Sequence, residues 1–153
     1  MISFKQFLIE NKNLDDRSMP EDDEFDSGEY WFNPILIFEA AKEGKLKFIK
    51  TNISINDYIT NNYNLKNKSK EYFLLHTNEL TNFGDPNKLL KYVQKIKTGN
   101  INLPPVLMVE TINNKILIDG NHRLIAAWLA DINTIPAYVF KIHDLNSNMF
   151  GKN

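Results

Sequence analysis

The stretch that decides the fold is KILIDGNHRLIAA, at residues 115–127 of this 153-residue chain. Its apolar run predicts a buried strand, Gly120 predicts a sharp turn, and the residues from Asn121 onward predict a helix. The first backbone N–H groups of a helix have no intrahelical partner and carry the positive end of the helix dipole. The pattern therefore favours an anion, such as phosphate, at the start of this helix.

The side chains around the turn suit phosphate. Gly120 lets a ligand approach the backbone closely, and Arg123 offers a planar fork of donors that matches phosphate oxygens. Asp119 ends the strand, where its carboxylate can hold a metal ion, a hydroxyl group or Arg123. An ordinary α/β connection has the same pattern, and Asn121 then serves only as the helix N-cap. A motif this short leaves both interpretations open.

A second helix is predicted upstream, because Asp85 and Pro86 suit an N-cap and a first helical position and Gly99 suits the residue after the end. Three apolar residues at helical spacing form one stripe: Leu89, Val93 and Ile96. Three lysines at spacings of three and four residues form another face: Lys88, Lys91 and Lys95. Such a face is commonly just solvated, but beside an anion-binding turn it can line a polyphosphate channel.

The order of these elements resembles the ParB/sulfiredoxin superfamily over residues 72–142. The matching pieces are strands at 71–76, 104–110, 115–119 and 135–142, with helices at 85–98 and 121–131. Residues 85–109 and 119–140 are similar to sulfiredoxins in spacing and in several identities, and DGNHR (119–123) is similar to a turn of free-serine kinases. The resemblance implies an α/β (α+β) fold, with a small mixed sheet and flanking helices.

The resemblance also implies which residues bind nucleotide phosphates. In the turn these are Gly120, Asn121, His122 and Arg123. Lys88 matches a lysine that contacts ATP in sulfiredoxins. Lys91 and Lys95 stand where those enzymes have hydroxyl side chains. The added charge implies a more anionic nucleotide or a nucleic acid as ligand.

The departures from the superfamily restrict the chemistry. Sulfiredoxins have a catalytic cysteine where this chain has Asn121, and the chain contains no cysteine, so sulfiredoxin chemistry is excluded. Free-serine kinases have a glutamate just before the second helix. Here that segment reads TNFG (81–84), with Glu79 nearby, which weakens kinase activity without excluding it. ParB proteins continue into a DNA-reading domain, which the short remainder after Ile142 is not expected to contain.

Charge and composition divide the chain into expected segments. Residues 1–30 hold nine acidic and three basic side chains, although the whole chain has a net charge of only −1. We expect a leader helix and a flexible acidic arm at 1–30, with a solvated linker at 15–29. A cover segment follows at 31–70, with a helix at 34–41, a strand at 47–52 and a helix at 55–60 capped by Ser54. The ParB/sulfiredoxin-like domain is expected at 71–145 and a tail at 146–153.

The first ten residues, MISFKQFLIE, predict a short amphipathic helix. This stretch resembles the capsid-targeting leaders of internal proteins of T-even-type tailed bacteriophages, which are cut after a Leu/Ile-x-Glu tripeptide, here Leu8-Ile9-Glu10. The alternative is a terminal helix that packs on the core. No apolar run reaches membrane-spanning length. We therefore expect no membrane partner, and a location in the host cytoplasm or, for a phage protein, inside the virion.

The leading functional expectation is binding of ATP or another NTP with Mg²⁺, coupled to phosphoryl transfer or hydrolysis. His122 and Arg123 are the expected catalytic groups that stabilise phosphate charge, and Asp119 is expected to orient a nucleophile or bind Mg²⁺. One alternative is a phage-encoded nucleic-acid-binding (DNA-binding) or nuclease-like accessory protein. Another is a capsid-packaged effector that uses the fold to bind a host or capsid protein.

Overall fold

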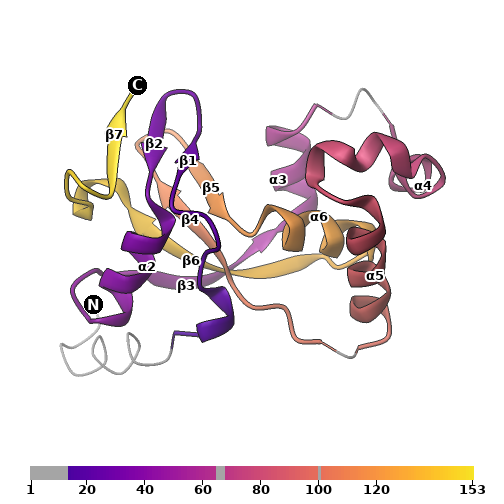
Figure 1. The fold of residues 1–153 in the computed structure, drawn as a ribbon, viewed down its shortest axis with the longest axis horizontal. Coiled ribbons are helices and arrows are strands. Elements are labelled where there is room, and N and C mark those ends of the chain that lie inside the picture. Colours follow the sequence, from indigo (N-terminus) through magenta and orange to yellow (C-terminus); the bar gives the residue numbers. More distant parts are fainter. Residues whose placement is uncertain (1–13, 65–67, 100) are drawn as a thin grey trace. The chain divides into compact units, whose positions relative to one another are not determined.

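The computed structural model describes residues 14–64, 68–99 and 101–153. The chain divides into two compact units, each made of separate stretches of sequence. The first comprises residues 1–51, 104–120 and 137–153, and the second comprises 52–103 and 121–136. Within the described residues the fold is mixed, with two small sheets and five α-helices (Figure 1). The expected mixed class is confirmed, and the expected leader helix lies outside the described residues.

The first unit contains a three-stranded antiparallel sheet, and one of its strands lies within the expected linker. Its order is β1-β2-β7, with β1 at Phe25–Asp26, β2 at Tyr30–Phe32 and β7 at Phe150–Lys152. The predicted tail therefore contains a strand. Trp31 lies opposite Gly151 in register, and its indole occupies the space that a Cβ at Gly151 would fill. Glycine is required at that position because any side chain would collide with the indole.

Residues 15–29, predicted as a flexible, solvated linker, are mostly exposed, but they contain a 3-10 helix and strand β1 and so are not a structureless linker. Leu14 and Ser18 are buried, and a 3-10 helix, η1, spans Asp16–Ser18. Asp15 caps it by accepting a hydrogen bond from the backbone N–H of Arg17, and its own N–H donates to the Tyr138 hydroxyl at 2.8 Å. The acidic composition correctly predicted exposure, and the few buried and capping residues between the acids anchor the segment.

The four-stranded sheet has the order β3-β6-β4-β5, with β4 antiparallel to β5 and parallel to β6. Its strands are β3 (Ile49–Ser54), β4 (Val106–Glu110), β5 (Lys115–Asp119) and β6 (Thr134–Lys141). Helix α2 (Pro34–Lys42) begins as predicted, since the Asn33 side chain accepts from the backbone N–H of Leu36. The largest members of the first unit's core are Phe32, Phe38, Tyr138 and Phe140.

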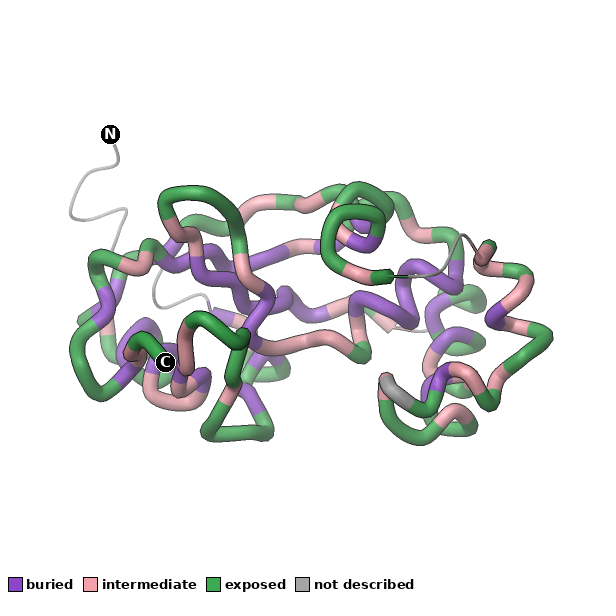
Figure 2. Tube along the Cα trace, turned by 90° about the horizontal axis from the view of Figure 1, so that it is seen from above, coloured by how far each residue is buried: buried purple, intermediate pink, exposed green. Residues whose placement is uncertain are grey.

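The second unit is helical and centres on α6 (Asn121–Leu129). Helix α6 contacts three other helices and a 3-10 helix in this unit. These are α3 (Ile55–Asn62), α4 (Lys70–Leu75), η2 (Thr77–Phe83) and α5 (Pro86–Lys97). Figure 1 labels α3, α4 and α5 together with α6. Every residue of α6 from Leu124 onward is buried. Figure 2 draws buried residues along the chain in purple. Only the first turn of α6 therefore remains accessible.

Local capping explains which helices were predicted correctly. Ser54 caps α3 by accepting from the backbone N–H of Asp57, and Asp85 caps α5 by accepting from that of Asn87 at 2.9 Å. The positive φ of 72° at Gly99 ends α5 where expected. Within the described residues, no helix has the length and apolar character to cross a membrane.

The predicted strand at residues 71–76 is wrong, because this segment forms α4. The short apolar run around Phe73 suits a strand or a helix equally well. Ser69 decides for a helix, since its hydroxyl accepts from the backbone N–H of Tyr72 at 3.2 Å. Phe73 is the buried residue of this helix, and Leu75 is 81% exposed.

Candidate functional site

The residues predicted to form the site lie where β5 ends and α6 starts, and the predicted turn between strand and helix is present. Gly120 has a φ of 101°, a backbone conformation that residues with a Cβ rarely adopt. Helix α6 begins at the next residue. In the first turn of α6, Asn121 and Arg123 are half-buried and His122 is exposed. Three polar side chains thus stand at the accessible end of a helix that is otherwise apolar and buried.

Tyr63 holds the side chain of Asn121. Its hydroxyl donates to Asn121 Oδ1 across 58 residues of sequence. The Tyr63 ring packs edge-on against Phe83, with ring centres 5.8 Å apart. Burial, with a smaller contribution from Tyr58, raises the pKa of Tyr63, so its hydroxyl stays protonated. Asn121 is the first residue of α6, not the residue before it, and its carboxamide oxygen accepts from a distant tyrosine.

His122 lies against the backbone of Gly84. A Cβ atom placed on Gly84 would stand 2.6 Å from His122 Nε2, closer than real Cβ contacts allow. Gly84 immediately precedes Asp85, the N-cap of α5, so this contact brings the first turns of α5 and α6 together in the second unit. Sequence reasoning missed both Tyr63 and Gly84, since neither has a local signal that points to α6.

The predicted lysine face is present on α5. Lys88, Lys91 and Lys95 are all exposed, whereas the predicted apolar stripe is buried. The buried stripe consists of Leu89, Val93 and Ile96. Lys88 lies in the first turn of α5, the turn that begins just after Gly84. The helix thus presents its positive charges to solvent, beginning near the contact with His122.

Glu79, the carboxylate that lies just before the kinase position, is paired with other residues. Lys68 Nζ lies 3.1 Å from Glu79 Oε2, and the Tyr72 hydroxyl donates to Glu79 Oε1 at 3.0 Å. The hydrogen bond from Lys68, aided by that from Tyr72, lowers the pKa of Glu79. The His76 ring stacks on Tyr72, with ring centres 4.1 Å apart. This cluster ties α4 to η2 and provides a structural role for the carboxylate.

Asp119 ends β5 in the first unit, where it is half-buried and pairs in register with Leu107. Among the residues that the structure describes, no three His, Cys, Asp or Glu side chains gather as metal ligands. Mg²⁺ often takes only one or two protein carboxylates and completes its shell with substrate phosphates and water. The expected role of Asp119 as a Mg²⁺ ligand stays a prediction.

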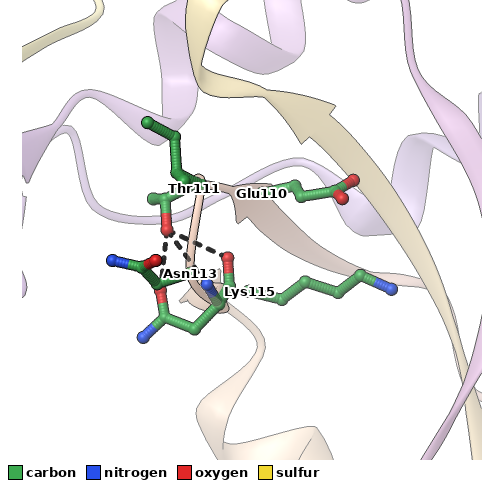
Figure 3. A pocket seen from close by; sticks show the side chains of 6 residues that line it. Glu110, Thr111, Asn113 and Lys115 are labelled. Atoms are coloured by element: carbon green, nitrogen blue, oxygen red, sulfur yellow. Dashed lines mark hydrogen bonds between the residues drawn. The ribbon is translucent and has the colours of Figure 1, made fainter.

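A shallow hollow of about 230 Å³ lies at the turn between β4 and β5, far along the strands from the predicted site. Its lining is the turn itself: Glu110, Thr111, Ile112, Asn113, Asn114 and Lys115. Figure 3 shows the Thr111 hydroxyl at its centre, where it donates to Asn114 Oδ1 at 2.8 Å. The hydrogen bonds between Thr111 and Asn114 stabilise the hairpin turn, so the hollow is part of the turn's own structure.

Comparisons with models of protein families, with curated proteins and with solved structures found no match for this chain. A function for this chain is therefore inferred from the geometry of the candidate site. Three features make up that geometry. The first turn of α6 is accessible, His122 packs on the backbone of Gly84, and α5, which carries the exposed lysines, begins just after Gly84.

Proposed function

We propose that this chain binds the phosphates of ATP or another NTP at the first turn of α6, and that it is a member of the ParB/sulfiredoxin superfamily. The observation that carries the proposal is the contact between His122 and Gly84. It joins the start of α6 to the start of α5, so that the donors of α6 and the first lysine of α5 belong to one region of the second unit. Converging positive charge and backbone donors favour a phosphate chain over a neutral ligand.

Each residue of the turn has a distinct role in this proposal. Gly120 allows phosphate oxygens to approach the backbone, and the first N–H groups of α6 donate to them. Arg123 supplies two parallel donors to a phosphate, and His122 supplies one from its imidazole. Lys88 and Lys91 add positive charge from α5 and neutralise the outer phosphates of the nucleotide.

The reaction that fits these groups is phosphoryl transfer or NTP hydrolysis. Little covalent chemistry is required of the protein in such a reaction, so positioning and charge stabilisation suffice. His122 and Arg123 stabilise the charge that develops on the transferred phosphate. Asp119 orients the attacking oxygen or holds Mg²⁺. A bound Mg²⁺ supplies further neutralisation of phosphate charge.

Asn121 distinguishes this proposal from sulfiredoxin activity. A carboxamide has no thiolate and cannot attack a phosphoryl-sulfinate as the sulfiredoxin cysteine does. With its oxygen accepting from Tyr63, Asn121 directs its amide group to other partners as a donor. An additional donor at the first turn of α6 again favours an anion.

The proposal is tested by thermal unfolding with ATP, CTP, GTP and ADP, each with and without Mg²⁺. A ligand present at 100 times its Kd stabilises the folded state by about 2.7 kcal/mol. We expect at least one triphosphate to raise the Tm by several degrees and adenosine, which lacks phosphates, to leave it unchanged. Unchanged Tm with all nucleotides at millimolar concentration contradicts the proposal.

A further inference from the structure

The exposed side of α5 is a continuous basic surface. Lys88, Lys91 and Lys95 are exposed and lie within about 60° of one another around the helix axis, at 3.6 residues per turn. With a rise of about 1.5 Å per residue, their Cα atoms span roughly 10 Å along the axis. Exposed Asn87 and Gln94 flank them. We call Lys88, Lys91 and Lys95 the lysine face.

The lysine face has no acidic counterpart on its own helix. The sequence of α5, PNKLLKYVQKIK, contains no carboxylate, and Asp85 before it is used as the N-cap. Elsewhere in the second unit, Glu79 pairs with Lys68, and Asp131 pairs with Lys70 at 3.0 Å. None of the ion pairs found among the described residues involves a member of the lysine face.

Charge is also unevenly divided between the two units. The second unit contains eight basic and five acidic residues, whereas the first contains ten basic and fourteen acidic. Like charges three and four residues apart on a helix repel one another and destabilise it slightly. The repulsion is relieved when an external anion neutralises the face. The anion must be extended, because the charges are spread along two turns of the helix.

We propose that the lysine face binds the phosphate backbone of a nucleic acid. Duplex DNA carries one negative charge per 1.7 Å or so of helix axis, so several phosphates lie within the roughly 10 Å that the face spans. Lysine ammonium groups on flexible stems contact phosphates without reading bases, and flanking amides donate to the same oxygens. The binding is therefore independent of base sequence and strongly dependent on salt. The lysine face shares Lys88 and Lys91 with the proposed nucleotide site, so this inference adjoins the proposed function and nucleotide and nucleic acid compete for that end of α5.

The test compares two variants of the full chain by fluorescence anisotropy with labelled duplex DNA of mixed sequence. The first is the triple variant Lys88→Gln, Lys91→Gln and Lys95→Gln. The control is Lys97→Gln, which removes an exposed lysine of the same helix from a position outside the face. Each phosphate contact contributes about 0.9 to the slope of log K against log salt. We expect the triple variant to lose about 2–3 from this slope and at least tenfold in affinity at about 50 mM salt.

We expect the slope of the Lys97→Gln variant to differ from the wild-type slope by no more than about 0.9, the contribution of one phosphate contact. Circular dichroism checks that all proteins are folded. Three results overturn the proposal: no DNA binding by the wild type at about 50 mM salt, a slope equal in the triple variant and the wild type, or tighter binding of poly-glutamate than of DNA. The last result would identify an acidic protein as the partner. ATP binding by the wild type is measured separately by calorimetry: DNA binding without ATP binding contradicts the nucleotide site alone, and ATP binding without DNA binding contradicts the lysine face alone.

Discussion

His122 Nε2 lies 2.6 Å from the point that a Cβ atom on residue 84 would occupy, so the histidine ring rests directly on the backbone of Gly84. Two features of Gly84 make this possible: it has no side chain, and its φ of 102° turns the chain into α5. The contact fixes the imidazole relative to both helix starts. It is the relationship on which the proposed phosphate site depends.

Gly84→Ala is expected to destabilise the protein and to displace His122. The positive φ alone costs about 1–2 kcal/mol with any L side chain, and the collision with His122 adds to that cost. Gly99→Ala is the matched control, because Gly99 has a φ of 72° and no atom within 4 Å of its Cβ position. Urea unfolding should show Gly84→Ala to be the less stable variant. Equal stability of the two variants contradicts the packing of His122 on Gly84.

The hydrogen bond between Tyr63 and Asn121 is expected to couple the end of α3 to the start of α6. Tyr63→Phe removes the hydroxyl but keeps the ring on Phe83, and Asn121→Ala removes the acceptor. In a double-mutant cycle of unfolding free energies, we expect a coupling of about 0.5–1.5 kcal/mol, typical of one hydrogen bond. A coupling near zero means that the two side chains do not interact in solution.

The ion pair between Lys68 and Glu79 predicts a pH dependence of stability. Lys68 and Tyr72 lower the pKa of Glu79 in the folded state, so the unfolded state binds the proton more tightly. The stabilisation is present above the ordinary glutamate pKa and is lost as the pH falls through the lowered folded value. Glu79→Gln should therefore lower the Tm at pH 7 and change it less at acid pH. A difference in Tm that is constant from pH 7 to pH 3 contradicts this role.

Asp119→Asn is expected to separate binding from chemistry. If the carboxylate orients the attacking oxygen or holds Mg²⁺, turnover of the nucleotide should fall by at least a hundredfold while the affinity for the nucleotide changes only a few-fold. If Asp119 only orients Arg123, affinity and turnover should fall together. Phosphate release and calorimetry measure the two quantities. Normal turnover removes Asp119 from the reaction.

Local signals explain which parts of the fold could be predicted from the sequence. Gly120 between an apolar run and an amphipathic run predicts β5, the turn and α6, because φ above zero is nearly free only for glycine. Asp85 and Pro86 likewise predict the start of α5. These signals act within a few residues of the chain, so no tertiary information is needed to use them.

The errors and omissions come from interactions that depend on the tertiary fold. Hydrophobicity around Phe73 suits either a strand or a helix, and the Ser69 cap that decides between them is a weak signal. The acidic segment 15–29 is anchored by Tyr138, more than a hundred residues away. The contacts of Tyr63 with Asn121 and of Gly84 with His122 also join distant segments. A single sequence has no pattern from which such pairs can be predicted.

The most direct test of the central claim is titration calorimetry of the full chain with ATP and Mg²⁺, before and after Arg123→Ala. The account predicts saturable binding by the wild type and a loss of about 2–4 kcal/mol in the variant, the range for a charge-assisted bidentate contact. Lys97→Gln, on another face of α5, should bind as the wild type does. Absence of binding by the wild type, or equal affinity in a folded Arg123→Ala variant, would contradict the phosphate site at the start of α6.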